Sequence, residues 1–115
     1  MDWNLREDIP IYSQLIYHLK VAVATGELKP GDKLSSVRDL ALDAKVNPNT
    51  MQRALTELER EGILYTQRTS GRFVTEDTSV VEKIKESLAE GHAREYMERM
   101  QELGYTKVNA ISHLR

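Results

Sequence analysis

The chain of 115 residues contains no cysteine. Neither disulfide bonds nor thiolate metal sites are therefore available to it, and a reducing cytoplasm is the compartment that we expect. Long apolar runs are also missing, and the first residues carry no basic segment of the kind that opens a signal peptide. We therefore expect neither contact with a membrane nor a cleaved leader. The sequence also lacks internal repeats and low-complexity stretches.

The composition is that of an ordinary soluble domain, with 40% apolar and 30% charged residues. The length allows one hydrophobic core with a short appendage. A formal net charge of −2 argues against a nucleic-acid partner, but the charge is unevenly placed. Residues 33–72 hold seven basic and five acidic side chains, whereas residues 76–115 hold six basic and eight acidic ones. The central part is thus mildly basic, which permits DNA binding without demanding it.

Hydrophobic periodicity predicts three helices in the first half of the chain. The first begins near Pro10, because proline suits the first helical turn, and it ends before Gly26. The second runs from about Ser36 to Ala44 with Ser35 or Ser36 as its cap, and the third runs from Pro48 to Glu61 with Asn47 as its cap. The side chains expected to face inward are Val37, Leu40, Ala41 and Ala44, then Met51, Ala54, Leu55 and Leu58.

After Gly62 the helical period gives way to two β-rich runs, residues 63–67 and 72–75, with turn-forming residues between them. This pattern predicts a β-hairpin. Two short helices followed by a hairpin have the order of a winged helix-turn-helix fold. The helix-turn-helix falls at about residues 36–55 and the wing at about residues 63–75, so the fold class is mainly α with one small hairpin.

From Asp77 onward the helical period returns. Gly91 lies where two apolar stripes slip out of phase, which predicts a kink or a break at that residue. Gly104 closes this segment, and Thr106 is placed to cap a last short helix. At the other end of the chain, Trp3 is expected to anchor either onto the core or onto a partner chain.

The exposed face of the third helix carries the chemistry of a DNA reader. Asn49, Gln52 and Arg53 lie opposite the apolar stripe, and no acidic residue interrupts this face before Glu57. Amide and guanidinium groups near the N-terminal end of such a helix can reach base edges in a major groove. An ordinary solvated helix mixes glutamate and lysine from its first turn, so this cluster favours DNA.

The hairpin tip adds two cations. Arg68 and Arg72 flank Gly71, where guanidinium groups can reach phosphates or a minor groove. Alone they would be ordinary exposed arginines, but beside the third helix they fit a DNA-binding wing.

No constellation of residues supports catalysis or metal binding. His18, His92 and His113 are far apart, and only His92 has a carboxylate, Glu95, one helical turn further on. The pair Ser35-Ser36 precedes no strand and lies in no Gly-x-Ser-x-Gly elbow, so it supplies a cap and not a nucleophile. We therefore expect no enzyme, no metal and no cofactor.

Five motifs follow one another in the sequence. They are Pro-Gly-Asp-Lys-Leu-Ser-Ser-Val-Arg-Asp-Leu-Ala at 30–41, Val-Asn-Pro-Asn-Thr at 46–50, Ala-Leu at 54–55, Leu-Glu-Arg-Glu-Gly at 58–62 and Gly-Arg-Phe-Val at 71–74. This ordered set resembles the GntR family of bacterial transcription regulators. Asn-Pro-Asn-Thr with a tail this short is similar to the YtrA-like subfamily. The resemblance is strong from Ile9 to about Val74 and weak in the tail.

The resemblance implies a dimeric protein that binds palindromic operators in double-stranded DNA, commonly as a repressor, and YtrA-like members often lie beside transporter genes. The family's DNA-contacting positions fall on Ser36, Arg38, Asn47, Asn49, Thr50, Gln52 and Gly71. We expect Arg38, Asn49 and Gln52 to read bases. We expect Ser36, Asn47, Thr50 and the wing to hold phosphates.

Two positions depart from the family pattern. Lys45 stands in the turn where the family usually has glycine, so we expect a left-handed backbone there at some energetic cost. Thr69 replaces the first glycine of the family's Gly-x-Gly in the wing, which leaves the geometry of the wing less determined than that of the third helix.

We place the winged domain at residues 1–76 and an all-helical dimerisation tail at residues 77–115. Too many apolar side chains lie on this tail to remain in water, so we expect them to pack against the tail of a second chain. They are Val81, Ile84, Leu88, Tyr96, Met97, Met100, Leu103, Ile111 and Leu114. Two identical heads would then read half-sites about 34–36 Å apart.

Larger relatives carry a separate effector domain, for which this tail is too short. A small-molecule signal is therefore expected at the dimer interface or not at all, and its identity is open. A winged-helix adaptor that binds protein instead of DNA is the alternative. The two are distinguished by retention on heparin and its dependence on salt.

Overall fold

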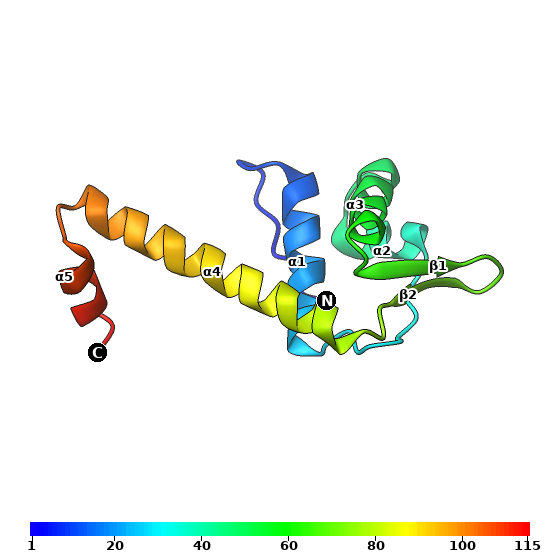
Figure 1. The fold of residues 1–115 in the computed structure, drawn as a ribbon. Helices are drawn as coiled ribbons and strands as arrows, with labels where there is room; N and C mark the ends of the chain where they lie inside the picture. The colour runs from blue at the N-terminus through cyan, green and yellow to red at the C-terminus, as the bar shows by residue number, and fades with distance from the viewer. The chain divides into compact units, whose positions relative to one another are not determined.

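The computed structural model describes all residues from Met1 to Arg115, and the chain forms two compact units, Met1–Lys85 and Glu86–Arg115. The elements are α1 (Ile11–Thr25), α2 (Val37–Ala44), α3 (Pro48–Arg60), β1 (Leu64–Gln67), β2 (Gly71–Val74), α4 (Thr78–Glu102) and α5 (Lys107–Ser112) (Figure 1). The fold is thus mainly helical with one two-stranded hairpin, as the sequence predicts. No helix combines the length with the apolar character that a membrane span requires.

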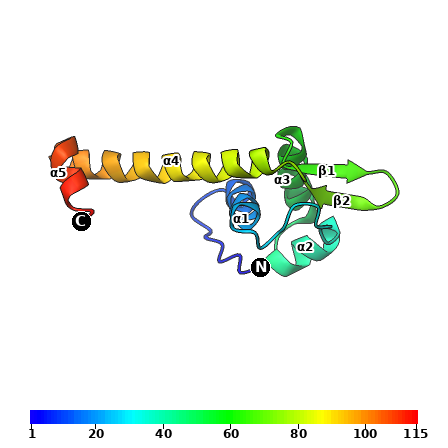
Figure 2. The same ribbon diagram turned by 60° about the horizontal axis from the view of Figure 1, so that its bottom comes forward.

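The helices of the first unit enclose a small apolar core. Helix α3 packs against α1, α2 and β1, and Figure 2 shows these elements gathered beside the hairpin. The predicted inward face of α3 is confirmed, since Met51, Ala54, Leu55 and Leu58 are all buried. In α2 only Ala41 and Ala44 are buried, and Val37 and Leu40 are half-buried. Val37 remains partly accessible because it lines an open hollow beside the wing.

The boundaries of the helix-turn-helix follow from local chemistry. The side chain of Ser36 accepts a hydrogen bond from the backbone N–H of Asp39, and that of Asn47 accepts one from Asn49. Asn47 is therefore the N-cap that the sequence predicts, and Ser36 is the cap of α2 among the two serines that the sequence allowed. Lys45 joins the two helices with φ 58° and ψ 48°, which confirms the expected left-handed conformation.

The strands β1 and β2 pair antiparallel, from Leu64 opposite Val74 to Gln67 opposite Gly71. This hairpin, residues 64–74, is the wing. Its strands differ from the predicted runs by one residue at three of the four ends. The register places the tip at residues 68–70.

A third stretch of chain pairs with β2. Lys33 forms an isolated bridge with Phe73, and the backbone N–H of Leu34 donates to the carbonyl of Arg72 at 2.9 Å. The turn that begins at Pro30 therefore delivers residues 31–34 to the free edge of the wing. This anchors the base of the hairpin to the helical core.

The helical tail differs from its prediction at one point. Helix α4 continues through Gly91, so the predicted break there is wrong. A glycine inside a helix costs about 1 kcal/mol relative to alanine, which is too little to end a long helix. Further on, Thr106 caps α5 as expected, and the hydroxyl of Tyr96 donates to the carbonyl of Ala110 at 2.6 Å. This bond fastens α5 to the end of α4 within the second unit.

Candidate nucleic-acid interface

The N-terminal half of α3 presents the polar face that the sequence predicts. Asn49, Gln52 and Arg53 are all exposed. The side chain of Asn49 forms no hydrogen bond within the chain, and Gln52 donates to the hydroxyl of Thr56 at 3.2 Å. The guanidinium of Arg53 lies 4.7 Å from the ring centre of Tyr12, a cation–π contact that restrains it. This face therefore offers the side-chain amides of Asn49 and Gln52 and a guanidinium, that of Arg53, which is restrained by Tyr12.

The two caps keep hydrogen-bond donors for a partner. Capping uses the side-chain oxygens of Ser36 and Asn47, but the hydroxyl hydrogen of Ser36 and the amide hydrogens of Asn47 remain. Such donors at helix N-termini suit phosphate oxygens. Arg38 is exposed and forms no hydrogen bond or ion pair within the chain, and Thr50 is half-buried. The guanidinium of Arg38 is thus free for a partner.

Gly71 is required where the wing meets the turn before α2. Its φ of +110° is strained for any residue with a side chain. A Cβ at this position would also lie 3.2 Å from Cε of Lys33, so the lysine stem crosses close to the wing. The sequence placed Lys33 in the motif at 30–41 but assigned it no contact with the wing. No sequence pattern marks this contact, because polar–apolar alternation indicates a strand only over about four to eight residues.

An open hollow of about 570 Å³ separates the start of α2 from the wing. Its lining includes Ser36, Gly71 and Arg72 from the predicted site, together with Lys33. The structure therefore brings residues of two predicted motifs, residues 30–41 and the wing, to one place, and Lys33 of the first motif lies there with Ser36.

The two arginines of the wing are not equivalent. Arg68 is exposed at the tip and forms no hydrogen bond or ion pair within the chain. Arg72 is only 18% exposed, and its Nε donates to Oε1 of Glu59 on α3. The same oxygen accepts a hydrogen bond from the hydroxyl of Thr66 at 2.8 Å. Partial burial opposes the charge of Glu59, but the hydrogen bonds from Arg72 and Thr66 hold its pKa below the ordinary value.

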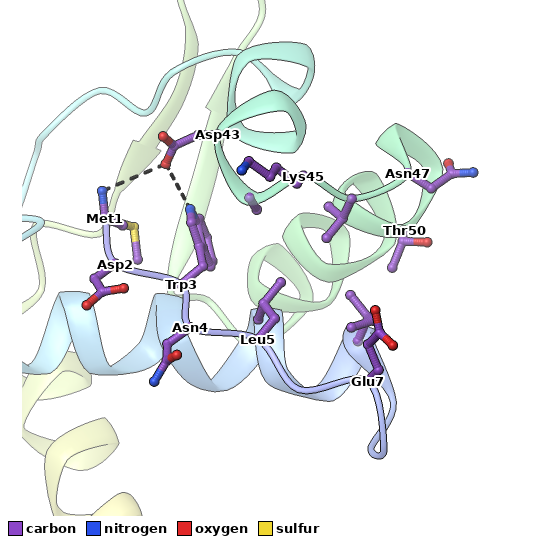
Figure 3. Close-up of a pocket in the computed structure, with 13 residues that line it drawn as sticks. Met1, Asp2, Trp3, Asn4, Leu5, Glu7, Asp43, Lys45, Asn47 and Thr50 are labelled. Carbon is purple, nitrogen blue, oxygen red and sulfur yellow. Dashed lines mark hydrogen bonds and ion pairs between the residues drawn. The ribbon is translucent and has the colours of Figure 1, made fainter.

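A second open hollow, of about 750 Å³, adjoins the start of α3 (Figure 3). One wall is the segment before α1, where Trp3 is 5% exposed and its indole N–H donates to Oδ2 of Asp43 at 2.8 Å. Trp3 therefore anchors onto its own chain. Lys45, Asn47 and Thr50 line the hollow on the side of the helix-turn-helix. Space for a small molecule thus exists within one chain.

The apolar residues expected at a dimer interface differ in exposure. Leu103, Ile111 and Leu114 are exposed, and Val81, Leu88, Tyr96, Met97 and Met100 are half-buried. Ile84 is only 8% exposed. It belongs to the compact unit Met1–Lys85 and is buried in its own chain, so it offers little surface to a second one.

The capped helices α2 and α3, the polar face of α3 and the hairpin beside it define a winged helix-turn-helix domain. Residues 11–74 match the family described as "Bacterial regulatory proteins, gntR family", and the chain belongs to this family. It is therefore a DNA-binding transcriptional regulator and not an enzyme.

Two curated relatives come from Bacillus subtilis. The chain is 38% identical over 115 residues to the HTH-type transcriptional regulator YhcF, and the match covers 100% of this chain and 95% of that protein. It is 42% identical over 98 residues to the HTH-type transcriptional repressor YtrA, with 85% of this chain and 71% of the relative covered. Both similarities extend beyond the winged domain into the tail.

Solved structures agree with this assignment. A GntR family transcriptional regulator from Listeria monocytogenes superposes with a TM-score of 0.89 at 36% identity and covers 96% of each chain. The structure of AraR(DBD) in complex with operator ORR3 has a TM-score of 0.55 at 25% identity and covers 58% of this chain and 81% of that one. The winged domain thus resembles one that has been solved on operator DNA.

Proposed function

We propose that this protein is a homodimeric repressor that acts in the cytoplasm and binds a palindromic operator through α3 and the wing. The observation that carries this proposal is the exposed face of α3. It presents Asn49 and Gln52 without an acidic neighbour, close in sequence to two caps that retain free donors. The similarity to a relative named as a repressor supports repression over activation.

Each side chain has a role that its chemistry suits. Arg38 can form two parallel hydrogen bonds with guanine, and the amides of Asn49 and Gln52 can do the same with adenine. Ser36, Asn47 and Thr50, together with Arg53 and Arg68, would hold phosphates. Phosphate contacts fix the register of the protein on the duplex, and base contacts supply the sequence preference.

Dimerisation is proposed to occur through the second unit, Glu86–Arg115. With 30 residues it is below the size of about 40 at which a chain usually supports its own core. It nevertheless exposes five large apolar side chains, Leu103, Tyr105, Val108, Ile111 and Leu114. A second copy would cover them and would hold two copies of α3 about 34–36 Å apart, as a palindrome requires. By resemblance to YtrA-like regulators, we place the operator at a transporter operon.

A matched pair of substitutions tests the dimer. Leu103 in the tail and Leu42 in α2 are nearly equally exposed, at 73% and 71%. We expect Leu103→Glu to give a monomer by sedimentation equilibrium and to lose its preference for half-site spacing. Leu42→Glu should remain dimeric. A monomeric wild type, or a Leu103→Glu variant as dimeric as the control, would show that the interface lies elsewhere.

A further inference from the structure

The wing depends on the rest of the domain for its orientation. A two-stranded hairpin is marginally stable by itself in water, so its attachments decide where its tip points. At the base, Leu64 and Val74 are buried, and residues 31–34 pair with β2. From Thr66 to Ser70, by contrast, every residue is exposed. The pairing with residues 31–34 reaches only as far as Arg72 on β2, so β1 has no backbone partner outside the hairpin at that level.

Glu59 contacts the hairpin from α3. Thr66 and Arg72 are directly opposite each other in the hairpin, so their side chains lie on the same face. Both donate to the same oxygen, Oε1 of Glu59. Only one further pair, Gln67 opposite Gly71, separates this contact from the tip. Glu59 thus forms hydrogen bonds with both strands, one residue pair away from the tip of the wing.

The opposite face of the hairpin has a different brace. Tyr65 and Phe73 form the neighbouring pair, and their rings stack with centres 5.6 Å apart and planes 22° apart. This stack joins the two strands to each other. Glu59 is the side chain of α3 that forms hydrogen bonds with both of them.

We propose that Glu59 is a positioning residue which fixes the tilt of the wing against α3 and so determines where the wing tip meets the operator. The inference rests on the proposed function, because α3 and the wing must engage the same duplex. A fixed tilt lets base contacts by α3 and backbone contacts by the tip form together only on DNA of the right groove geometry. Glu59 contributes to specificity without touching DNA.

The ion pair between Glu59 and Arg72 also makes the charge of Arg72 less available to DNA. With its Nε bound to Glu59, Arg72 is held against α3, and Arg68 is the unpaired arginine of the wing. Removing Glu59 would free Arg72 and delete one negative charge near the DNA. Non-specific affinity should then hold or rise while the preference for the operator falls, an outcome that general destabilisation does not produce.

Glu57 supplies the matched control. It lies on the same helix and carries the same charge, but its partner is Arg60, whose Nε is 2.7 Å from Oε2 of Glu57. Glu57→Ala therefore removes an equal charge and a glutamate–arginine ion pair from α3 without touching the wing. Glu59→Gln is the conservative variant, because its amide oxygen can still accept from Thr66.

The absence of cysteine makes the tip easy to observe. Ser70→Cys gives a unique site for a nitroxide label on the exposed loop of the full-length protein. Electron paramagnetic resonance without DNA should show greater nanosecond mobility of the label in Glu59→Ala than in wild type or Glu57→Ala, with Glu59→Gln between. Equal mobility in the two alanine variants would overturn the proposal.

Binding gives the second readout. The ratio of affinity for the selected operator to affinity for random duplex of the same length should fall about tenfold in Glu59→Ala, the scale of one charge-assisted hydrogen bond. It should be unchanged in Glu57→Ala. An equal loss on both duplexes would overturn the positioning role. If wild type shows no preferred duplex, the proposed function fails, and the mobility comparison still decides whether Glu59 holds the wing.

Discussion

The turn between α2 and α3 stores backbone strain that one substitution should release. Lys45 is held at φ 58° and ψ 48° while its N–H donates to the carbonyls at the end of α2. A left-handed conformation costs a residue with a side chain about 1–2 kcal/mol. Glycine avoids this cost, but it destabilises the folded state by about 0.5–1 kcal/mol relative to alanine, because it loses more conformational entropy on folding. Lys45→Gly should therefore raise the free energy of unfolding by about 0.5–1 kcal/mol.

Thermal unfolding of the full chain without DNA, followed by circular dichroism, measures this gain. For a unit the size of Met1–Lys85, we expect a rise in Tm of about 2–6 °C. Lys45→Ala is the control, because it removes the same charge but keeps a Cβ, and it should give no rise. An unchanged or lower Tm in Lys45→Gly, or an equal rise in Lys45→Ala, would refute the assignment of strain to the backbone.

Three further predictions concern the charged and polar groups of the interface. Arg38→Ala and Gln52→Ala should each cost about 1–3 kcal/mol on the operator and relax specificity in a competition assay, whereas equal losses on random duplex would mean phosphate contacts. Arg68→Ala should weaken binding to every duplex and reduce the slope of log affinity against log salt by about one; an unchanged slope would place the tip off the DNA. Because the pKa of Glu59 is lowered on folding, its stabilisation is present above the ordinary value of 4.5 and is lost as pH falls through the lowered one. The Tm difference between wild type and Glu59→Gln should shrink in acid.

Local chemistry explains why the helix-turn-helix was predictable. Ser36 and Asn47 are caps in the sequence and in the structure, and Pro48 follows as the first residue of its helix. The left-handed backbone conformation of Lys45 was also predictable, because the family that the sequence resembles usually has glycine at this position. Each of these features depends on residues within one helical turn, which a linear sequence displays directly.

Contacts between distant residues account for what was missed. Arg72 and Glu59 are thirteen residues apart, and no pattern separates a paired arginine from the free one at Arg68. Trp3 and Asp43 are forty residues apart, so the choice between core and partner chain needed the folded chain. The break predicted at Gly91 was wrong for a different reason, because a change in the phase of the apolar stripe need not interrupt the helical backbone.

The central claim is that two copies of this domain read a palindrome, and selection of bound sequences from random duplex DNA tests it most directly. With the wild-type protein as bait, we predict enrichment of one site with two inverted half-sites whose centres lie about 10–10.5 base pairs apart, or a multiple of that distance. The same selection with Leu103→Glu should yield single half-sites. Failure of the wild-type protein to enrich any sequence, or enrichment of one asymmetric motif, would contradict the account.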